Sequence, residues 1–340
     1  MSAADAGGLA AADRALRDAF EPYTVAKKEF KDAIRSKGLW LLGVLFTTAF
    51  IAPVALALYF DIGLSTRGQD LGMQLLLSQV YLNMVTFLLP IVAIFVGFAA
   101  VSKERTSGSL KILLSLPHSR RDVIVGKVLG RCAVLGVPLI ASLALTAVFL
   151  AASRLTFKPE LFGLFSLFTV VFAVVFVAIV VSISGALAKS LYSGIANFVV
   201  YFYFTFLWNS GANGIGKVLS NQLGVTGATR WHAVLLLKLA NPNQAYKTLV
   251  NSMLSEADAP ALAARYRMFS QGAEASRTIC GRVLNGAPQA QQTPFGTFVS
   301  CNPDGSLPFY YSDPAVLAFM LAWIAIAATI SYYTFSLADL

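Results

Sequence analysis

Six apolar runs, each long enough to cross a bilayer, constrain the fold of this chain more than any other feature. A helix rises about 1.5 Å per residue, so about 20 apolar residues cross the roughly 30 Å of hydrocarbon in a membrane. The runs are Leu39–Phe60, Leu75–Val101, Val123–Ala152, Leu161–Ala188, Leu191–Trp208 and Ala315–Leu337. We therefore expect an all-α polytopic membrane protein with six transmembrane helices, and the close spacing of the fourth and fifth runs predicts a tight helical hairpin.

The composition excludes several classes of protein. Apolar residues make up 57% of the chain and charged residues only 13%, whereas ordinary globular proteins have roughly 25% charged residues. A net charge of +9 would suggest nucleic acid in a soluble protein, but Lys and Arg gather on the cytoplasmic side of membrane proteins whatever their function. We expect no nucleic-acid partner, and no metal site, because two His and three Cys leave little material for one.

Basic residues beside the runs predict the orientation of the chain. Before the first run stand Arg14, Arg17, Lys27, Lys28, Lys31, Arg35 and Lys37, whereas Arg67 is alone in the loop 61–74. Both termini are then cytoplasmic. The expected domains are an N-terminal cytoplasmic segment (1–38), spans 1 to 5 (39–208), an extracellular segment (209–314), and the sixth span with a short cytoplasmic C-terminus (315–340).

The extracellular segment is uneven in composition. Its two cysteines, Cys280 and Cys301, could form a disulfide in an oxidising exterior, with two unpaired thiols in a loose loop as the alternative. We expect Trp231–Leu254 to be helical and to lie in or near the outer leaflet, and we expect Asn285–Pro308 to be a loop, because it is rich in Gly, Pro, Gln and Ser.

One pattern in this segment resembles a phosphate-binding loop. Gly211, Gly216 and Lys217 satisfy G-x-x-x-x-G-K, but Val218 stands where a Ser or Thr must bind magnesium. The pattern also follows a membrane span rather than a strand. We therefore expect a flexible glycine-rich turn that leaves the bilayer.

Polar residues inside the spans are few. Lys127 and Arg131 lie near the cytoplasmic end of the third span, and we expect both to reach the lipid headgroups rather than to form an ion path. No Asp or Glu lies at the centre of a run, which argues against a proton relay. The residues that could line a translocation path are Asn83, Thr86, Asn197 and Tyr201, and bonding between neighbouring helices is the favoured alternative.

A segment before the first span has the pattern of an interfacial helix. Between residues 23 and 37, apolar residues recur at intervals of three and four, with Lys and Arg on the other faces. The residues that define this elbow helix are Tyr23, Lys27, Phe30 and Ile34. A simple electrostatic anchor to anionic lipid is the alternative.

The cytoplasmic loop 102–122 predicts a second short helix. Leu110, Leu113 and Leu114 form one apolar edge, and Pro117 ends the helix. Such a helix suits a groove on another protein, and the alternative is a loop helix that rests on the bilayer.

The same loop resembles a known family. Its residues Glu104-Arg105, Gly108-Ser109-Leu110, Leu113-Leu114-Ser115-Leu116-Pro117, Ser119-Arg120 and Gly126-Lys127 resemble the segment between the second and third spans of ABC-2 type permeases, the six-span membrane subunits of a class of prokaryotic ATP-binding-cassette transporter. The match is specific over about 101–130 and weaker elsewhere.

The resemblance implies a function for the whole chain. It implies a permease subunit in the plasma membrane of a prokaryote, not catalytic itself, that exports substrate with a second permease subunit, identical or similar, and two ATPase subunits that bind ATP and Mg. By the same resemblance, Glu104–Pro117 is the coupling helix on the ATPase, and its residues are Glu104, Arg105, Gly108, Ser109, Leu110, Leu113, Leu114, Leu116, Pro117 and Arg120. The elbow helix shares this contact. An ATP-independent channel or secondary transporter, and a membrane anchor or assembly protein, stay open as alternatives.

Overall fold

The computed structural model describes residues 20–60, 76–107, 120–254, 273–293, 296–303 and 308–336. Within these ranges six helical stretches are long and apolar enough to cross a membrane. They are Lys37–Tyr59, Leu76–Ser107, Arg121–Ala151, Pro159–Ala186, Ser190–Gln222 and Asp313–Thr334. Each contains most or all of one predicted run, so the prediction of six spans is confirmed.

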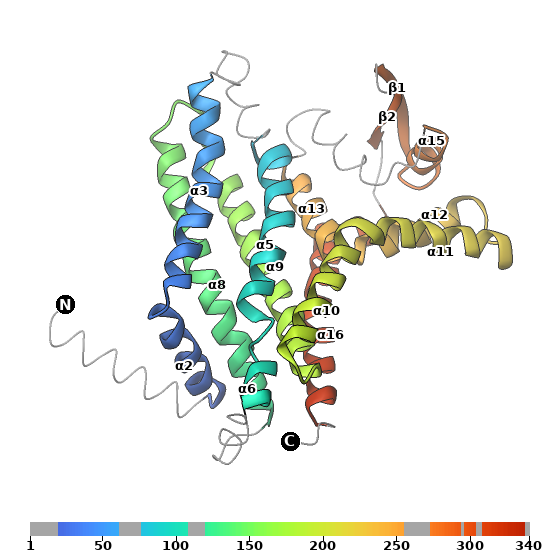
Figure 1. Ribbon diagram of the computed structural model, residues 1–340. Helices are drawn as coiled ribbons and strands as arrows, with labels where there is room; N and C mark the ends of the chain where they lie inside the picture. The colour runs from blue at the N-terminus through green and yellow to red at the C-terminus, as the bar shows by residue number, and fades with distance from the viewer. Residues whose placement is uncertain are drawn as a thin grey trace.

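The spans form one helix bundle (Figure 1). Its helices are α3 (Lys37–Tyr59), η1 (Leu76–Tyr81) with α5 (Leu82–Gly97), α8 (Arg120–Ala151), α9 (Pro159–Ala186), α10 (Ser190–Phe202) with η2 (Tyr203–Leu207), and α16 (Asp313–Ser336). Two shorter helices, α2 (Pro22–Ile34) and α6 (Ser102–Ser107), lie at the same end of the bundle as the end of α16. The turn from α9 to α10 is short, as predicted for the helical hairpin.

Helix α9 is the centre of the core. It contacts α5, α8, α10, α13 (Pro242–Met253) and α16, and Phe165, Phe172 and Val181 along it are fully buried. By contrast, α3 at the edge exposes Trp40 (73%) and Leu41 (70%). A helix that is apolar all round is either buried or faces lipid, so the same composition serves both places.

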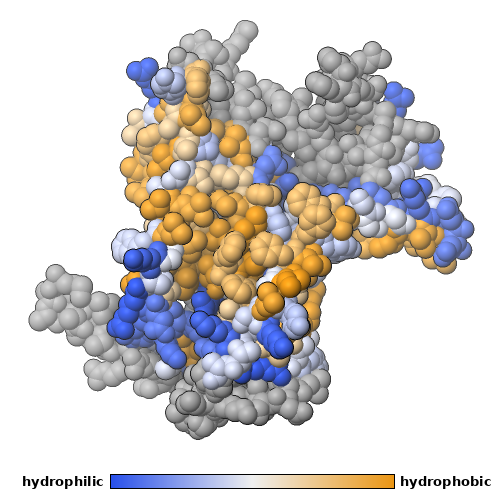
Figure 2. Space-filling model, viewed as in Figure 1, coloured by the Kyte–Doolittle hydropathy of each residue, from blue (hydrophilic) through white to orange (hydrophobic). Residues whose placement is uncertain are grey.

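The fifth span bends out of the bundle at η2. Figure 1 shows α11 (Trp208–Gln222) turning away from α10 and running beside α12 (Gly227–Leu239). Figure 2 shows that this arm is hydrophilic on its upper side and hydrophobic beneath, a pattern typical of helices that lie at a membrane surface. The part of the fifth span that lies within the bundle therefore ends near Trp208, where the predicted run also ends.

The prediction of a flexible glycine-rich turn is wrong. Gly211, Gly216 and Lys217 lie inside α11, and a side chain at Gly216 would collide with Val234 of α12. The second glycine therefore permits close packing of two helices. A phosphate loop opens a helix after a strand, and this glycine pair has a different setting.

The prediction of a loop over 285–308 is also wrong, so the chain is not wholly α-helical. An antiparallel ribbon forms from β1 (Gly286–Thr293) and β2 (Gly296–Pro303), with Gly286 opposite Pro303 and Thr293 opposite Gly296. It packs beside α15 (Ala273–Arg282). The helical prediction for Trp231–Leu254 is correct in type, but Pro242 divides it into α12 and α13, and the Asn241 side chain caps α13 by accepting from the Asn243 N–H. A short η3 (Phe309–Tyr311) precedes the last span.

Candidate functional site

Four charged side chains from three helices meet at the end of the bundle that carries α2. Lys127 Nζ of α8 lies 2.9 Å from Glu29 Oε1 of α2 and 2.7 Å from Glu104 Oε1 of α6. Arg131 Nη2, one turn further along α8, lies 2.8 Å from Glu29 Oε2. These residues, Glu29, Glu104, Lys127 and Arg131, are the ion-pair cluster. Their formal charges balance.

The cluster is largely shielded from solvent. The side chain of Lys127 is 1% exposed, that of Glu29 11% and that of Glu104 27%. The prediction that Lys127 and Arg131 reach toward lipid headgroups is therefore wrong: both are held by carboxylates, because a buried cation needs a counter-charge. Removing one partner of a buried pair costs about 3–5 kcal/mol, and the partial exposure of Glu104 reduces that cost here.

Two glycines on α8 let α2 approach closely enough to form the cluster. A Cβ at Gly126 would lie 2.6 Å from Val25 Cβ and 2.7 Å from the Pro22 carbonyl oxygen. A Cβ at Gly130 would lie 2.6 Å from Glu29 Cβ. Glycines four residues apart form a shallow groove on a helix and permit close packing. The two cations, Lys127 and Arg131, are also four residues apart. The groove at the glycines therefore holds α2 against α8, and the two cations bind the carboxylate of Glu29 on α2.

The start of α6 is anchored to α9 as well as to α8. Ser184 Oγ of α9 accepts hydrogen bonds from the backbone N–H groups of Val101 (3.1 Å) and Ser102 (3.2 Å). Val101 immediately precedes α6 and Ser102 is its first residue. Backbone N–H groups at the start of a helix lack partners inside the helix. Glu104 therefore stands on a short helix that is tied to two spans.

The structure describes only part of the predicted coupling helix. Glu104 and Arg105 lie in α6, and Arg120 begins α8. The other predicted residues, Gly108, Ser109, Leu110, Leu113, Leu114, Leu116 and Pro117, lie outside the described residues. Where the prediction directed Glu104 toward a partner protein, the structure pairs it with Lys127.

The elbow segment is a helix, but its apolar face is not simply turned to lipid. Its buried residues are Pro22 and Val25, which face α8, whereas Ile34 is 44% exposed. Lys27 lies over the ring of Tyr23, 5.8 Å from its centroid. Phe30 is partly buried. Docking to α8 therefore uses residues other than those that the periodicity singled out.

The four polar residues proposed for a path have different surroundings. Thr86 and Asn197 are buried and donate to carbonyl groups of their own helices, those of Leu82 and Ser193. Tyr201 donates to the Phe87 carbonyl across to α5 at 3.3 Å. Asn83 is exposed and accepts from Lys247. The Tyr201 bond is the one of these that joins two spans.

The cysteines differ in their state. Cys280 of α15 is disulfide-bonded and Cys132 of α8 is free. Cys301 lies in β2, which packs against α15. The side chain of Cys301 lies outside the described residues.

Glu29 is the residue of the ion-pair cluster that the sequence analysis did not identify. Two cations four residues apart near a span end, beside a glycine pair with the same spacing, were a signal that a carboxylate from another helix must approach. The sequence does not tell which of the nearby carboxylates does so.

Comparison with known proteins agrees with this architecture. The family model described as "ABC-2 family transporter protein" matches residues 23–340. The six spans and this match define a multi-pass membrane protein of the permease class of ABC transporters. The chain belongs to the ABC-2 transporter family.

Two curated relatives share this class. The chain is 31% identical over 110 residues to the "Probable ABC transporter permease protein NosY" of Pseudomonas aeruginosa, a match that covers 32% of this chain and 38% of the relative. It is 28% identical over 131 residues to the protein of the same name from Stutzerimonas stutzeri, covering 38% of this chain and 45% of the relative. The chain thus matches less than half the length of either relative.

Proposed function

We propose that this permease subunit, together with a second identical or similar permease, forms the translocation path of an exporter driven by separate ATPase subunits. The observation that carries the proposal is the ion-pair cluster. It joins α2, the start of the 102–122 loop and the third span, so a displacement of one of these elements is passed to the others.

The coupling segment of this proposal is Glu104–Pro117, with α2 beside it. The ATPase subunits would bind ATP and Mg and would press on this segment when they close. Lys127 and Ser184 then carry the movement of α6 into α8 and α9. If Lys127 separated from its carboxylates, a buried charge would be left without a counter-charge, which is costly. We therefore expect α6 and α8 to move as one body.

The remaining assignments follow the same scheme. The protein lies in the plasma membrane of a prokaryote with both termini in the cytoplasm, and the segment 209–314 is extracellular. There we propose a disulfide between Cys280 and Cys301. Asn83, Thr86, Asn197 and Tyr201 are the candidates for the path between the two permeases, and lipid surrounds the bundle.

The first test is purification of the tagged chain in mild detergent, with mass spectrometry of the proteins that accompany it and an assay of ATP hydrolysis. We expect a stoichiometric ATPase, and we expect its loss when Leu113 and Leu114 are both replaced by Asp. A pure chain without ATPase after gentle extraction would contradict the proposal and would favour an autonomous channel or a scaffold.

A second test separates binding from coupling and requires no knowledge of the cargo. Spin labels at positions 103 and 151 report the distance between α6 and the far end of α8. Because α6 and α8 move as one body, we expect ATP to leave this distance unchanged in the assembled complex of the unsubstituted chain. Lys127→Met should retain the ATPase, but ATP should then change the distance between α6 and α8. Lys31→Met, on the exposed face of α2, should behave like the unsubstituted chain.

A further inference from the structure

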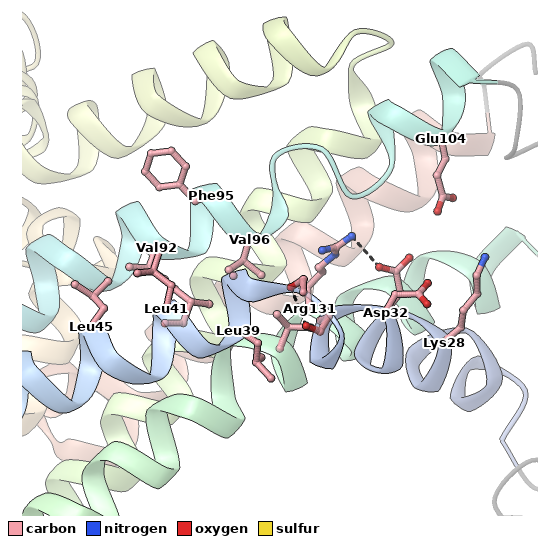
Figure 3. Close-up of a pocket in the computed structure, with 16 residues that line it drawn as sticks. Lys28, Asp32, Leu39, Leu41, Leu45, Val92, Phe95, Val96, Glu104 and Arg131 are labelled. Carbon is pink, nitrogen blue, oxygen red and sulfur yellow. Dashed lines mark hydrogen bonds and ion pairs between the residues drawn. The ribbon is translucent and has the colours of Figure 1, made fainter.

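A groove of about 660 Å³ opens between α2, α3, α5 and α8, beside the ion-pair cluster. Its walls change character along its length (Figure 3). Lys28, Asp32, Glu104 and Arg131 line one end, and Leu41, Leu45, Val92 and Phe95 line the other. The volume is in the range of small-molecule sites.

The apolar end of this groove is continuous with the outer surface of the spans. Leu41 is 70% and Phe95 65% exposed, whereas Val92, deeper in the groove, is 4% exposed. The charged end is formed by α2, α6 and α8 where the first span begins. An occupant therefore needs an apolar part that extends into the bilayer and a polar part at its boundary.

The charges at the polar end favour a zwitterion. Glu29 and Glu104 are balanced by Lys127 and Arg131 within the ion-pair cluster. This leaves Lys28 and Asp32, one charge of each sign, on exposed positions one turn apart on α2. No ion pair joins either of them to another residue in the part of the chain that the structure describes.

Arg131 supplies a second donor for an anionic group. Its Nη2 is used by Glu29, but its Nε is buried and has no hydrogen-bond partner among the described residues. A guanidinium has five N–H donors and binds phosphate with particular strength. Arg131 lines the groove and 26% of its side chain is exposed, so its guanidinium can donate to a phosphate at this end.

From these observations we infer that the groove binds a phospholipid whose headgroup carries a phosphate and a primary ammonium, the phosphatidylethanolamine class. The phosphate would lie against Lys28 and Arg131, the ammonium would donate to Asp32, and an acyl chain would follow Leu41 and Phe95. A purely anionic headgroup would leave Asp32 facing like charge. A choline headgroup has no N–H to donate.

The test measures lipid retention and therefore does not depend on transport. The assembled complex is exchanged into detergent with equal amounts of phosphatidylethanolamine, phosphatidylcholine and phosphatidylglycerol, and bound lipids are counted by native mass spectrometry. We expect one retained phosphatidylethanolamine per chain. Asp32→Asn should reduce its retention about tenfold, the loss expected for one charge-assisted hydrogen bond, and Lys28→Gln should reduce it similarly.

The matched controls are Lys31→Gln on α2 and Glu21→Gln just before it, which change exposed charges outside the groove and should leave retention unchanged. Filling the apolar end by Leu45→Trp should abolish retention without altering any charge. Equal retention of the three lipids, an equal loss in the controls, or no retention because a second copy of the chain covers the groove would each overturn the inference.

Discussion

Lys127 Nζ on α8 lies 2.7 Å from Glu104 Oε1 on α6, while the same nitrogen lies 2.9 Å from Glu29 on α2. One buried ammonium group thus ties α2, the first helix of the described chain, to α6, the helix that begins the loop 102–122. The two carboxylates compete for the same cation, and Arg131 relieves the competition by taking the second oxygen of Glu29.

Neutralising Lys127 should destabilise the protein more than neutralising Glu104. Lys127→Met leaves Glu29 paired with Arg131 and removes the cation that Glu104 contacts, and we expect a loss of about 3 kcal/mol. Glu104→Gln should cost less, about 1 kcal/mol, because this carboxylate is partly exposed to water. Unfolding in detergent, followed by circular dichroism against denaturant, measures both.

Substitution of both residues gives the coupling between them. In a double-mutant cycle the Lys127→Met and Glu104→Gln effects should be non-additive by more than about 0.5 kcal/mol. Additive effects would show that the 2.7 Å contact contributes nothing to stability.

The glycine groove on α8 makes a prediction with an internal control. Gly126→Ala should push α2 away, because the new methyl group would meet Val25 and the Pro22 carbonyl. Gly136→Ala on the same helix meets nothing within 4 Å, and it should be neutral or stabilising by about 0.5–1 kcal/mol, since Ala favours helix over Gly. Unfolding in detergent, followed by circular dichroism against denaturant, compares the two variants. Equal free energies of unfolding in Gly126→Ala and Gly136→Ala would contradict the packing described here.

Lys238 on α12 predicts a rise of stability with pH. Burial lowers the pKa of Lys238 from its ordinary value of 10.5 to about 8. Between these values the unfolded chain binds more protons than the folded chain, so the free energy of unfolding increases as the pH rises from about 8 to about 10.5. Below this window both states are protonated and the penalty of the buried charge is fully present.

The comparison variant for this pH dependence is Lys238→Met, which has no ammonium group at that position. The difference between the two unfolding midpoints should narrow between pH 8 and pH 10, since deprotonation gives the unsubstituted chain a neutral side chain there. A constant difference across this range would show that Lys238 reaches solvent in its charged form.

Thiol counting tests the proposed disulfide. The chain has three cysteines, of which Cys132 is free and Cys280 is bonded. In denaturant without reductant one thiol per chain should react with a maleimide, and three should react after reduction. Cys301→Ser should expose the thiol of Cys280 without reductant. Three reactive thiols in the unreduced, unsubstituted chain would exclude the bond.

The spans were predictable because their cause is local. A run such as Leu161–Ala188 has no alternative to the bilayer, and α9 occupies Pro159–Ala186. Most ends of the runs lie close to helix ends because charged and polar residues mark them, but the second helical stretch continues to Ser107 and the fifth to Gln222. The same reasoning identified the helical hairpin at Lys189 and the helix before the first span.

Features that depend on distant partners were not predictable from pattern. The strand β1 consists mainly of Gln, Ala, Gly and Pro, which have weak strand propensity, and it forms by pairing with β2 beside α15. Gly216 resembles a turn residue in the sequence, yet it lies inside a helix, where Val234 packs against the position that a side chain would occupy. Glu29 and Lys127 are 98 positions apart, and nothing in either neighbourhood identifies the other.

The seat of α2 on α8 sets an order for biosynthesis. Residues 22–34 leave the ribosome long before Gly126 and Gly130 exist, so α2 has no groove to occupy while the first two spans insert. Its exposed lysines and its apolar residues suit a temporary stay at the membrane surface. The groove and the two cations become available only when the third span has inserted. Glu29 can then bind the cations and fix α2 on α8. This end of the protein is therefore completed only after α8 is in the membrane.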